Sequence, residues 1–496
     1  MKKTLFEYLL VILLLSPLLF INIRDSHDWG DDFAGYLRQA KNISEGKPFY
    51  QSKFEFHDYN PVYSPPYYSY GFPLLLAPVV KAYGLDFKAL DRYMSLWTIA
   101  WALLIFGYLR RYFSLFTSVS FILLFFLNPF FFDFKTNVIS DIPFAFFFLL
   151  SLFLYIDRKS KSIFYQFLAG LIIAFTIGIR GVGVVIPLVI LLDLFIKCIS
   201  FLLKNISKEE VKSEIKETSI ILFSATAYIL ILNNVIFPTP ANLNQHFIGL
   251  FRYEHYSDMI LKNLDVYTTE FNNLFHHDVG KYSFSIQYTS AFMLVLLVIG
   301  FVNTLLSRHR FEMMVLITFC LVVVLFPYSN QGFRYLLPVL PILILCIIQG
   351  ASSIQTAPGY NKTFLALLFV IFILLQYKKE VRMMRDNQTT PIWPGPFTED
   401  SRKAIDHIKS AIPEGALIAC LKPRAIELFT DQLTCVLPIG NDIPDIANKL
   451  KVAKPDYLLS IKDLGTRVDS LAHYRKDSLI WENNACRLYL CTDHQK

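Results

Sequence analysis

The sequence predicts a polytopic α-helical membrane protein with a small α/β domain at its C-terminal end. Of the 496 residues, 54% are hydrophobic and 18% are charged, and the mean hydropathy is +0.43. These values are typical of a chain that lies mostly in lipid, and they exclude a disordered chain, a collagen-like repeat and a disulfide-rich mini-scaffold. The composition changes sharply after Tyr377, where charged residues return and helix and strand patterns begin to alternate.

About eleven stretches are apolar enough to cross a bilayer, whose hydrocarbon core needs roughly 20 mostly apolar residues per helix. The first stretch follows Met1-Lys2-Lys3 but lacks a small-x-small cleavage site, so we interpret it as an anchor rather than a signal peptide. The predicted spans are about 5–23, 91–109, 114–132, 138–156, 163–179, 182–200, 218–236, 289–307, 312–328, 335–350 and 363–377.

Lys and Arg gather in alternate short loops, which the positive-inside rule assigns to the cytoplasm. With a cytoplasmic N-terminus, the short outer turns hold only Lys135, Arg180 and Arg334. An odd number of spans then places the C-terminal tail on the outer side of the cytoplasmic (inner) membrane. The same rule explains the net charge of +7, so we infer no nucleic-acid partner. The inner loops hold Lys2, Lys3, Arg110, Arg111, Arg158, Lys159, Lys161, Lys204, Lys208, Lys212, Lys216, Arg308, Arg310 and Lys362.

These patterns divide the chain into a transmembrane domain at 1–377, a linker at 378–396 and an extracytoplasmic domain at 397–496. Two outer loops are long, at about 24–90 and about 237–288. In the last unit, SRKAIDHIKSAI, RAIELF and IPDIANKLKV have helical patterns, and ALIACL, TCVLPI, DYLLSI and CRLYLC have strand patterns. The unit has no Gly-rich phosphate loop and no nucleophile-and-base motif, so we expect it to handle the acceptor or to cap a cavity.

An acidic pair, Asp31 and Asp32, stands just beyond the first predicted span. Two adjacent carboxylates repel, which suits one of them to take up a proton during a reaction, and a bound cation would relieve the same repulsion. The alternative is structural, because Asp at the start of a helix accepts backbone N–H bonds and interacts favourably with the helix dipole. This feature alone leaves both interpretations open.

The same outer loop continues with an aromatic segment, YNPVYSPPYYSYGFPLLLAPVVKAYG. Its part PLLLAPVVKAYG is too short to span the bilayer and is typical of a helix that lies along the membrane surface. The Tyr and Phe side chains suit either an aromatic belt at the interface or a platform for a ligand.

Three further charged residues lie at the outer ends of predicted spans. Asp141 opens the fourth span, where a carboxylate is costly and is usually functional or paired, although Ser140-Asp141 also suits a helix N-cap. Arg180 and Arg334 are single cations among apolar neighbours. A guanidinium stays charged when desolvated and offers a planar fork of donors that suits phosphate, whereas the alternative is that both side chains snorkel to the interface.

In this order, five motifs resemble the polytopic GT-C glycosyltransferases. The motifs are WGDDFAGYLRQAKNISEGKPFY, YSPPYYSYGFPLLLAP, SDIPFAFFFLL, IRGVG and GFRYLLPVLP. The similarity is to the bacterial group related to protein O-mannosyltransferases and to the lipid A aminoarabinose transferase, and LKPRAIELFTDQ and CRLYL in the tail are also similar to that group. The resemblance implies a GT-C-like fold and a hexosyl- or pentosyltransferase that builds cell-envelope glycan from a sugar on polyprenyl phosphate.

The resemblance also implies roles for residues. Asp31 matches the catalytic base and Asp32 a supporting position. Asp141 matches an acidic residue near the donor phosphate, the acceptor or a metal, and Arg180 and Arg334 match basic positions that hold the lipid phosphate.

One position departs from the group. Where the aminoarabinose transferases carry Glu-Lys before the Pro-Pro pair, this chain has Tyr63-Ser64. The difference argues against aminoarabinose as the donor sugar and against a metal site copied from that enzyme.

The predicted chemistry is a direct, inverting displacement of the lipid phosphate by an acceptor hydroxyl on a glycan, a lipid or a protein. An Asp base accepts the hydroxyl proton and Arg stabilises the leaving phosphate. We assign no cofactor, and a divalent cation bridging a carboxylate and the phosphate stays open. The main alternative is a polysaccharide or lipid transporter (flippase), which would carry a polar track at mid-membrane depth. A structural protein whose charges are caps and anchors is a third interpretation.

Overall fold

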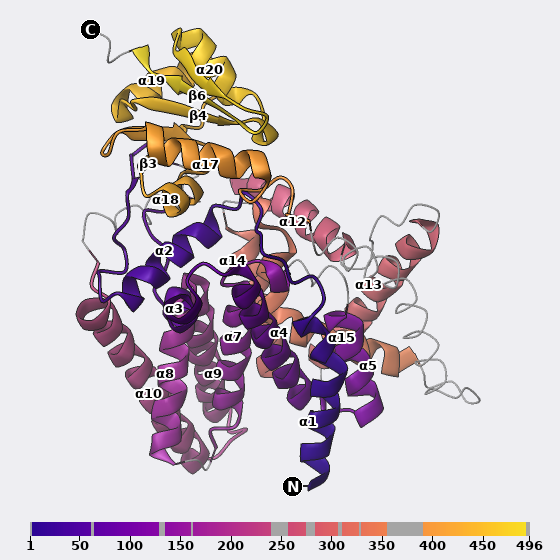
Figure 1. Cartoon of the computed structure of the whole chain (residues 1–496). Coiled ribbons are helices and arrows are strands. Elements are labelled where there is room, and N and C mark those ends of the chain that lie inside the picture. Colours follow the sequence, from indigo (N-terminus) through magenta and orange to yellow (C-terminus); the bar gives the residue numbers. More distant parts are fainter. Residues whose placement is uncertain are drawn as a thin grey trace.

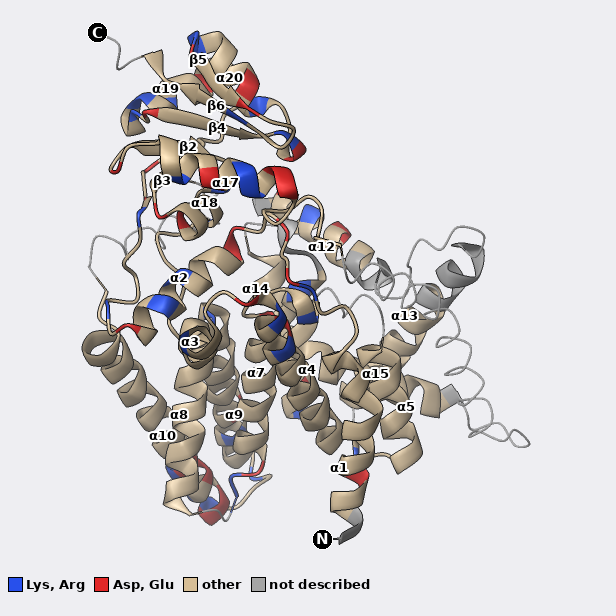
Figure 2. Ribbon diagram, viewed as in Figure 1, with Lys and Arg blue, Asp and Glu red and all other residues tan. Residues whose placement is uncertain are grey.

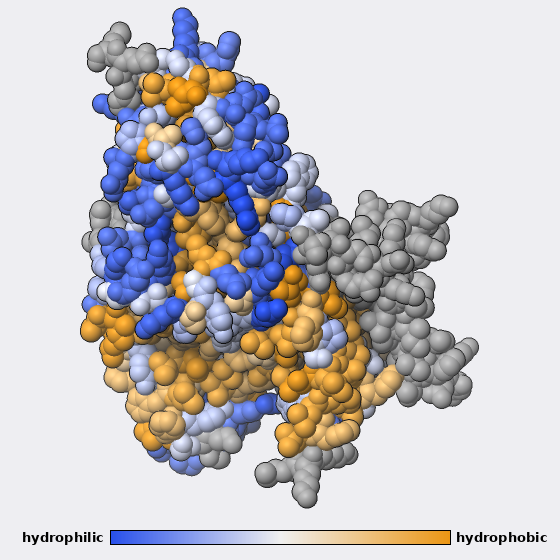
Figure 3. All heavy atoms as spheres, in the orientation of Figure 1, coloured by the Kyte–Doolittle hydropathy of each residue, from blue (hydrophilic) through white to orange (hydrophobic). Residues whose placement is uncertain are grey.

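A bundle of apolar helices, capped at one end by an α/β domain, makes up the computed structural model of the chain (Figure 1). It describes residues 2–60, 64–127, 134–159, 162–239, 256–273, 283–305, 310–326, 329–354 and 390–492. The N-terminus and the α/β domain lie at opposite ends of the bundle (Figure 1). On the face shown in Figure 3, hydrophobic residues form a broad band over the helices, whereas the surface of the α/β domain is mostly hydrophilic.

Each predicted span from 5–23 to 335–350 falls on a helix, and the span 363–377 lies outside the described residues. Among the described residues, four segments are long and apolar enough to cross a membrane by length and composition: Phe87–Leu109, Gly181–Leu202, Lys208–Ile236 and Phe333–Ser353. The number of spans therefore stays a prediction. The helices of the bundle and its loops are α1 (Lys2–Leu15), η1 (Ser16–Leu19), α2 (Asp32–Ser44), α3 (Gly71–Tyr83), α4 (Phe87–Leu109), α5 (Leu115–Phe126), α7 (Asp141–Ile156), α8 (Ile163–Ile179), η2 (Gly181–Val184), α9 (Val185–Leu202), α10 (Lys208–Ile231), η3 (Leu232–Ile236), α12 (Tyr256–Asn273), α13 (Ser283–Leu305), α14 (Arg310–Val324), η6 (Ser329–Val339) and α15 (Leu340–Ile354).

Short polar side chains set where several of these helices begin. The hydroxyls of Ser162 and Ser207 accept hydrogen bonds from the backbone N–H groups of Tyr165 and Glu210 at the starts of α8 and α10. Such caps satisfy N–H groups that have no partner within the helix. A polar residue therefore marks the start of α8 and of α10.

The two long loops, which the charge pattern predicts to be outer loops, both contain helices at the end of the bundle that carries the α/β domain (Figure 1). In the first loop, α2 packs against α3, which is the short apolar helix expected from PLLLAPVVKAYG. In the second loop, the Asn263 amide on α12 donates to the backbone carbonyls of Val324 at 2.8 Å and Phe326 at 2.7 Å. This contact holds the C-terminal end of α14, where carbonyl groups lack partners within the helix.

The C-terminal α/β domain contains the helices and strands expected from its sequence patterns, together with β5 and α20, which those patterns did not indicate. Its sheet has six strands in the order β1-β3-β2-β4-β6-β5, with β1, β3, β2 and β4 parallel and β6 antiparallel to both neighbours. Helices α17 and α18 lie on the side facing the bundle, and α19 and α20 lie on the far side (Figure 1). The elements are α17 (Glu399–Ala411), β2 (Leu417–Cys420), α18 (Pro423–Thr430), β3 (Leu433–Val436), α19 (Ile443–Ala453), β4 (Tyr457–Ile461), η7 (Lys462–Leu464), α20 (Arg467–Arg475), β5 (Ser478–Glu482) and β6 (Cys486–Leu490).

One strand of this sheet comes from the first outer loop rather than from the C-terminal segment. Strand β1 (Phe54–Glu55) pairs in parallel with β3, and the Thr434 N–H donates to the Lys53 carbonyl at 2.9 Å. The buried hydrophobic cluster of the bundle also continues into α17 and α18. The α/β domain is therefore joined to the loop by a shared sheet and to the bundle by a shared core.

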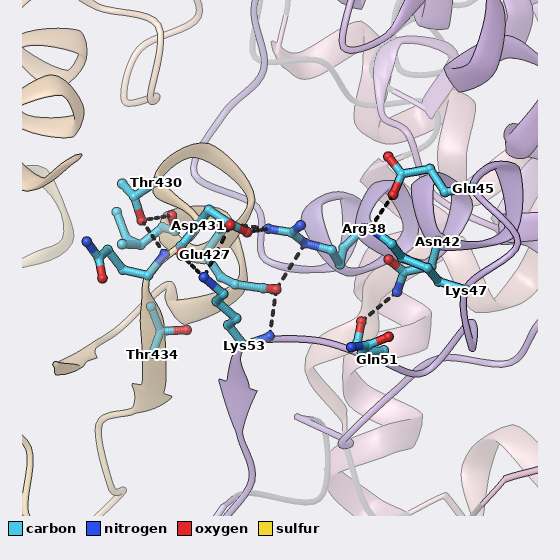
Figure 4. A network of polar contacts seen from close by, with 12 residues as sticks. Arg38, Asn42, Glu45, Lys47, Gln51, Lys53, Glu427, Thr430, Asp431 and Thr434 are labelled. Atoms are coloured by element: carbon cyan, nitrogen blue, oxygen red, sulfur yellow. Dashed lines mark hydrogen bonds and ion pairs between the residues drawn. The ribbon is translucent and has the colours of Figure 1, made fainter. Parts of the chain in front are cut away.

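Charged side chains reinforce this junction (Figure 4). Arg38 on α2 pairs with Glu427 at 3.0 Å and with Asp431 at 3.0 Å, both on or next to α18. The Lys53 backbone N–H donates to Glu427 at 2.9 Å, and its ammonium lies 3.2 Å from Asp431. Burial raises the pKa of Glu427, although Arg38 offsets part of that effect. Burial also acts against the charge of Asp431, but the contacts with Lys53 and Arg38 together outweigh burial and lower the Asp431 pKa.

Candidate active site

The five residues selected from the sequence lie together at the end of the bundle that carries the α/β domain. Asp31 and Asp32 stand at the start of α2, and Asp141 is the first residue of α7. Arg180 lies in extended conformation between α8 and η2, and Arg334 lies in η6. Residues far apart in the sequence thus meet at one place.

Asp141 is the centre of an ion cluster. Its side chain is fully buried, and it pairs with the Arg180 guanidinium. The Arg334 Nη2 lies 3.0 Å from Asp141 Oδ2 and 3.3 Å from Asp32 Oδ2, so this guanidinium bridges two acids. The Arg180 guanidinium also lies 4.9 Å from the centre of the Tyr335 ring. A buried carboxylate needs such partners, because an unpaired charge in a low-dielectric surrounding is strongly unfavourable.

The side chain of Asp31 does not cap helix α2, which was the structural interpretation of the acidic pair. Asp31 occupies the N-cap position of α2, but its side chain makes no capping hydrogen bond. Its Oδ1 instead accepts the backbone N–H of Arg424 at 3.0 Å, and its Oδ2 pairs with the Arg424 guanidinium at 2.7 Å. Asp32 accepts a hydrogen bond of 2.7 Å from the Tyr68 hydroxyl. Both carboxylates are therefore bound by side chains from elsewhere in the chain.

Arg424 is a site residue that the sequence patterns did not single out. It stands in the first turn of α18 and inserts its side chain, 4% exposed, between the α/β domain and the first outer loop. There it also donates to the Tyr68 hydroxyl at 3.3 Å and to the Pro65 carbonyl, and it lies 4.5 Å from the centre of the Phe54 ring. A positive charge in the first turn of a helix interacts unfavourably with the helix dipole. Arg424 directly follows Lys422-Pro423 at the start of α18, and this position indicated that an acidic partner lies nearby.

Burial changes the pKa values of the tyrosine and arginine side chains around these acids. Burial is the largest cause that raises the pKa of Tyr36 to about 12 and that of Tyr68 well above its usual value, and the Asp32 charge adds to both. Burial opposes the charge on Arg424, but Tyr68 and Asp31 outweigh it and raise the Arg424 pKa. At neutral pH both hydroxyls therefore stay protonated, the Tyr68 hydroxyl donates to Asp32, and the guanidinium stays charged.

These residues surround a cavity of about 600 Å³ between the first outer loop, the end of α8, η6 and the α/β domain. Asp31, Asp32, Arg180, Arg334 and Arg424 all line it. A second cavity of about 290 Å³ adjoins it and is lined mostly by apolar side chains of α7, α14 and η6. Arg180 and Arg334 line both cavities, so the two guanidiniums stand where a polar chamber meets an apolar one.

The carboxylates do not fit a resident divalent cation. Asp31 is bound by Arg424, and Asp32 and Asp141 are bound by Arg334, so a metal ion would have to displace guanidiniums from all three. Within the described ranges, no group of three or more His, Cys, Asp or Glu side chains is placed to hold a metal. We therefore derive no step through a metal ion.

Comparisons with known proteins agree with this arrangement at the level of fold. The family model described as predicted membrane protein (DUF2079) matches residues 32–439, which reach from the acidic pair past Arg424. No curated protein matches the chain.

Solved structures of two membrane proteins are among those similar to the chain. One is the archaeal oligosaccharyltransferase AglB from Archaeoglobus fulgidus in complex with an inhibitory peptide and a dolichol-phosphate, with a TM-score of 0.57, 13% identity, and coverage of 98% of this chain and 74% of AglB. The other is ArnT from Cupriavidus metallidurans, whose undecaprenyl-phosphate complex has a TM-score of 0.53 and whose apo form has a TM-score of 0.55. Both ArnT structures are 12% identical and cover 97% of each chain. The GT-C-like fold expected from the five motifs is thus confirmed.

Proposed function

Because the chain belongs to the family described as predicted membrane protein (DUF2079) and has the fold of AglB and ArnT, we propose that it is a membrane glycosyltransferase. It moves a sugar from a polyprenyl-phosphate donor to an acceptor hydroxyl on the outer side of the cytoplasmic membrane. The N-terminus lies in the cytoplasm, and the α/β domain is extracytoplasmic.

The observation that carries this proposal is the position of Arg180 and Arg334. Both guanidiniums line the polar cavity and also the apolar cavity beside it. A polyprenyl phosphate has an apolar chain and an anionic head, so its phosphate suits the junction and its chain suits the apolar side. The dolichol-phosphate and undecaprenyl phosphate in the AglB and ArnT structures support a lipid phosphate as the donor carrier.

The two guanidiniums also suit the chemistry of the leaving group. When the acceptor oxygen attacks the anomeric carbon, the bond from that carbon to the phosphate oxygen breaks and its electron pair stays on the phosphate. Preorganised donors at developing negative charge are worth about 2.7–4 kcal/mol each in comparable sites. Asp141 holds Arg180 and Arg334 in place for this role, since it pairs with both.

Asp31 accepts the proton of the attacking hydroxyl. Its side chain lines the polar cavity and is 17% exposed, so an acceptor can reach it. General bases of this kind typically contribute a factor of about 10²–10⁴ in rate. Asp32 supports the site by accepting from Tyr68 and pairing with Arg334. One base on the acceptor side and direct displacement together give inversion at the anomeric carbon.

The distribution of charged residues along the helix bundle favours an enzyme over a transporter. Figure 2 shows charged residues gathered toward the two ends of the helix bundle and long uncharged stretches between them. At the end away from the α/β domain, Arg111 pairs with Asp157 and Arg158 pairs with Glu214. A transporter would instead carry ionisable groups or broken helices near mid-span.

Mass spectrometry of surface glycans tests the proposal in cells that have, lack or carry variants of the protein. We expect a glycan product to depend on the protein and to fall by about 10²–10⁴-fold in Asp31→Asn. The matched control is Asp58→Asn, an exposed acid of the same loop, which should leave the product unchanged. Identical glycans with and without the protein would contradict the proposal, and full activity of Asp31→Asn at normal membrane levels would remove Asp31 as the base.

A further inference from the structure

A third chamber of about 510 Å³ lies beside the reaction cavity and shares Ser69 and Gly181 with it. One wall comes from the first outer loop, and the other comes from the end of α10, from η3 and from the residues that follow. The chamber thus adjoins the reaction cavity, and neither the donor phosphate nor the base proposed above occupies it.

Four aromatic rings pack together in this chamber. Tyr70 and Phe237 stack with ring centres 4.5 Å apart and an angle of 9° between the planes. The Phe49 ring lies edge-on to Phe237 at 5.7 Å and to Tyr67 at 5.7 Å. Tyr70 and Phe49 are buried, whereas Phe237 and Tyr67 are half-buried and can offer ring surface to a ligand.

The backbone leaves room for this cluster at a glycine. A Cβ atom at Gly178, near the end of α8, would lie 2.6 Å from the Tyr70 hydroxyl oxygen, so only glycine lets Tyr70 lie this close to the helix. The rings are therefore built into the junction between the loop and the bundle.

The described residues that line this chamber include no charged side chain. Their polar groups are the carboxamides of Asn233 and Asn234, both exposed, and the hydroxyls of Ser69 and Thr239. The reaction cavity next to it is different, because Asp31, Arg180 and Arg424 carry charge there. An anionic ligand would thus find partners in the reaction cavity but none among these lining residues.

We propose that this chamber binds the acceptor and that the acceptor is a neutral carbohydrate. The inference rests on the proposed glycosyltransferase function and names the substrate class of its acceptor. Aromatic faces pack against the C–H faces of sugar rings, carboxamides hydrogen-bond to hydroxyl groups, and the absence of charge in the described lining disfavours phosphorylated or acidic acceptors. The volume lies within the usual range of small-ligand sites, about 300–1,000 Å³. From here, an acceptor hydroxyl enters the reaction cavity past Ser69 and Gly181, toward Asp31.

The test measures binding of the full-length protein, held in lipid nanodiscs, to an array of neutral, uronate-containing and phosphorylated oligosaccharides. We expect binding to neutral members, weakened about two- to tenfold in Phe237→Ala, because an aromatic contact is worth roughly 0.5–1.5 kcal/mol beyond its buried area. Phe237→Tyr should retain the affinity, since it keeps the ring. The matched control is Phe223→Ala, because Phe223 is 71% exposed on α10 and does not line the chamber.

Binding of undecaprenyl phosphate to the same nanodiscs separates this inference from the proposed function. Phe237→Ala should leave it unchanged, which also shows that the variant is folded, whereas Arg180→Ala should weaken it. Three results would overturn the acceptor proposal: no binding of neutral glycans, a preference for acidic glycans or peptides, or equal affinities in Phe237→Ala and Phe223→Ala. If the wild-type protein bound neutral glycans but not undecaprenyl phosphate, the donor assignment would be contradicted and the carbohydrate site would still stand.

Discussion

The two ends of the helix bundle both contain buried ion clusters, and the clusters differ in what else their cations contact. At the end away from the α/β domain, Arg158 is 3% exposed, pairs with Glu214 and stacks on Tyr155 at 3.8 Å. Lys197 there bridges Asp193 at 2.7 Å and Glu214 at 2.9 Å. These ion pairs join the α7–α8 connection to α9 and α10.

At the α/β-domain end, the cations hold acids and also line cavities. Arg180 and Arg334 pair with Asp141 and face both the polar and the apolar chamber. The comparison teaches that ion pairing alone does not mark a functional site. A guanidinium becomes a candidate ligand for phosphate when a cavity adjoins it and an acid behind it fixes its direction.

The largest expected difference between the two ends concerns lipid phosphate. Arg334→Ala should lower transfer by about 10²–10³-fold, because it removes a preorganised donor to the leaving group. Arg158→Ala, the matched change at the other end, should leave undecaprenyl-phosphate binding unchanged in nanodiscs. Equal lipid-phosphate affinities in the two variants would contradict the claim that only the cluster next to the cavities binds lipid phosphate.

A substitution in the ion cluster at the end away from the α/β domain tests whether that cluster stabilises the protein. Glu214 pairs with Arg158, Lys159 and Lys197, so Glu214→Gln removes an acid that three cations share. Lys197 keeps Asp193 as a partner, and Arg158 keeps Glu217 at 3.9 Å. Removing one partner of a buried ion pair costs about 3–5 kcal/mol. We expect a shorter half-life of the folded protein at raised temperature, with unchanged lipid-phosphate affinity in the surviving fraction. An unchanged half-life would show that this cluster does not stabilise the bundle.

A smaller effect is expected where Arg424 joins the α/β domain to the site. Arg424→Ala leaves Asp31 without its partner, but Asp31 faces a cavity, so we expect a cost of about 1–3 kcal/mol. Hydrogen exchange of α18 should become faster and glycan product should fall, and Arg424→Lys should restore part of both. Unchanged exchange in Arg424→Ala would show that β1 pairing and the Arg38–Glu427 contact suffice to dock the domain.

The smallest effect is a pH dependence of the same junction. The pKa of Asp431 is lowered in the folded protein, because its hydrogen bond with Lys53 and its contact with Arg38 outweigh burial. Its contribution is therefore present above the unfolded value of about 3.9 and is lost as pH falls through the folded value. Asp431 is 64% exposed, so solvent screening limits the contribution to within about 1 kcal/mol.

Hydrogen exchange of α18 at decreasing pH measures this contribution. The wild type should lose protection at the acid end, and Asp431→Asn should remove that part of the loss. A loss of the same size in both proteins would assign the acid sensitivity to other groups at the junction.

Much of the site was predictable from residue type and position. Asp141, Arg180 and Arg334 were identifiable because single charges at the ends of apolar segments need partners. Arg424 was less visible, because its segment reads as an ordinary amphipathic helix of a small α/β domain. The sequence patterns also did not indicate β5, whose residues are mostly exposed and so lack the apolar alternation of a buried strand.

The sequence by itself determined the class of protein, the apolar helices and the alternation of helices and strands after Tyr377. Hydrophobic content and period act locally along the chain, so they can be recognised without knowing which segments meet. Tertiary structure decided which charges meet, which acid each guanidinium holds and which of them adjoin a cavity. It also decided that β1 completes a sheet at the other end of the chain and that Arg424 joins Asp31. Pairings over such distances depend on how whole elements pack, and no local pattern encodes that packing.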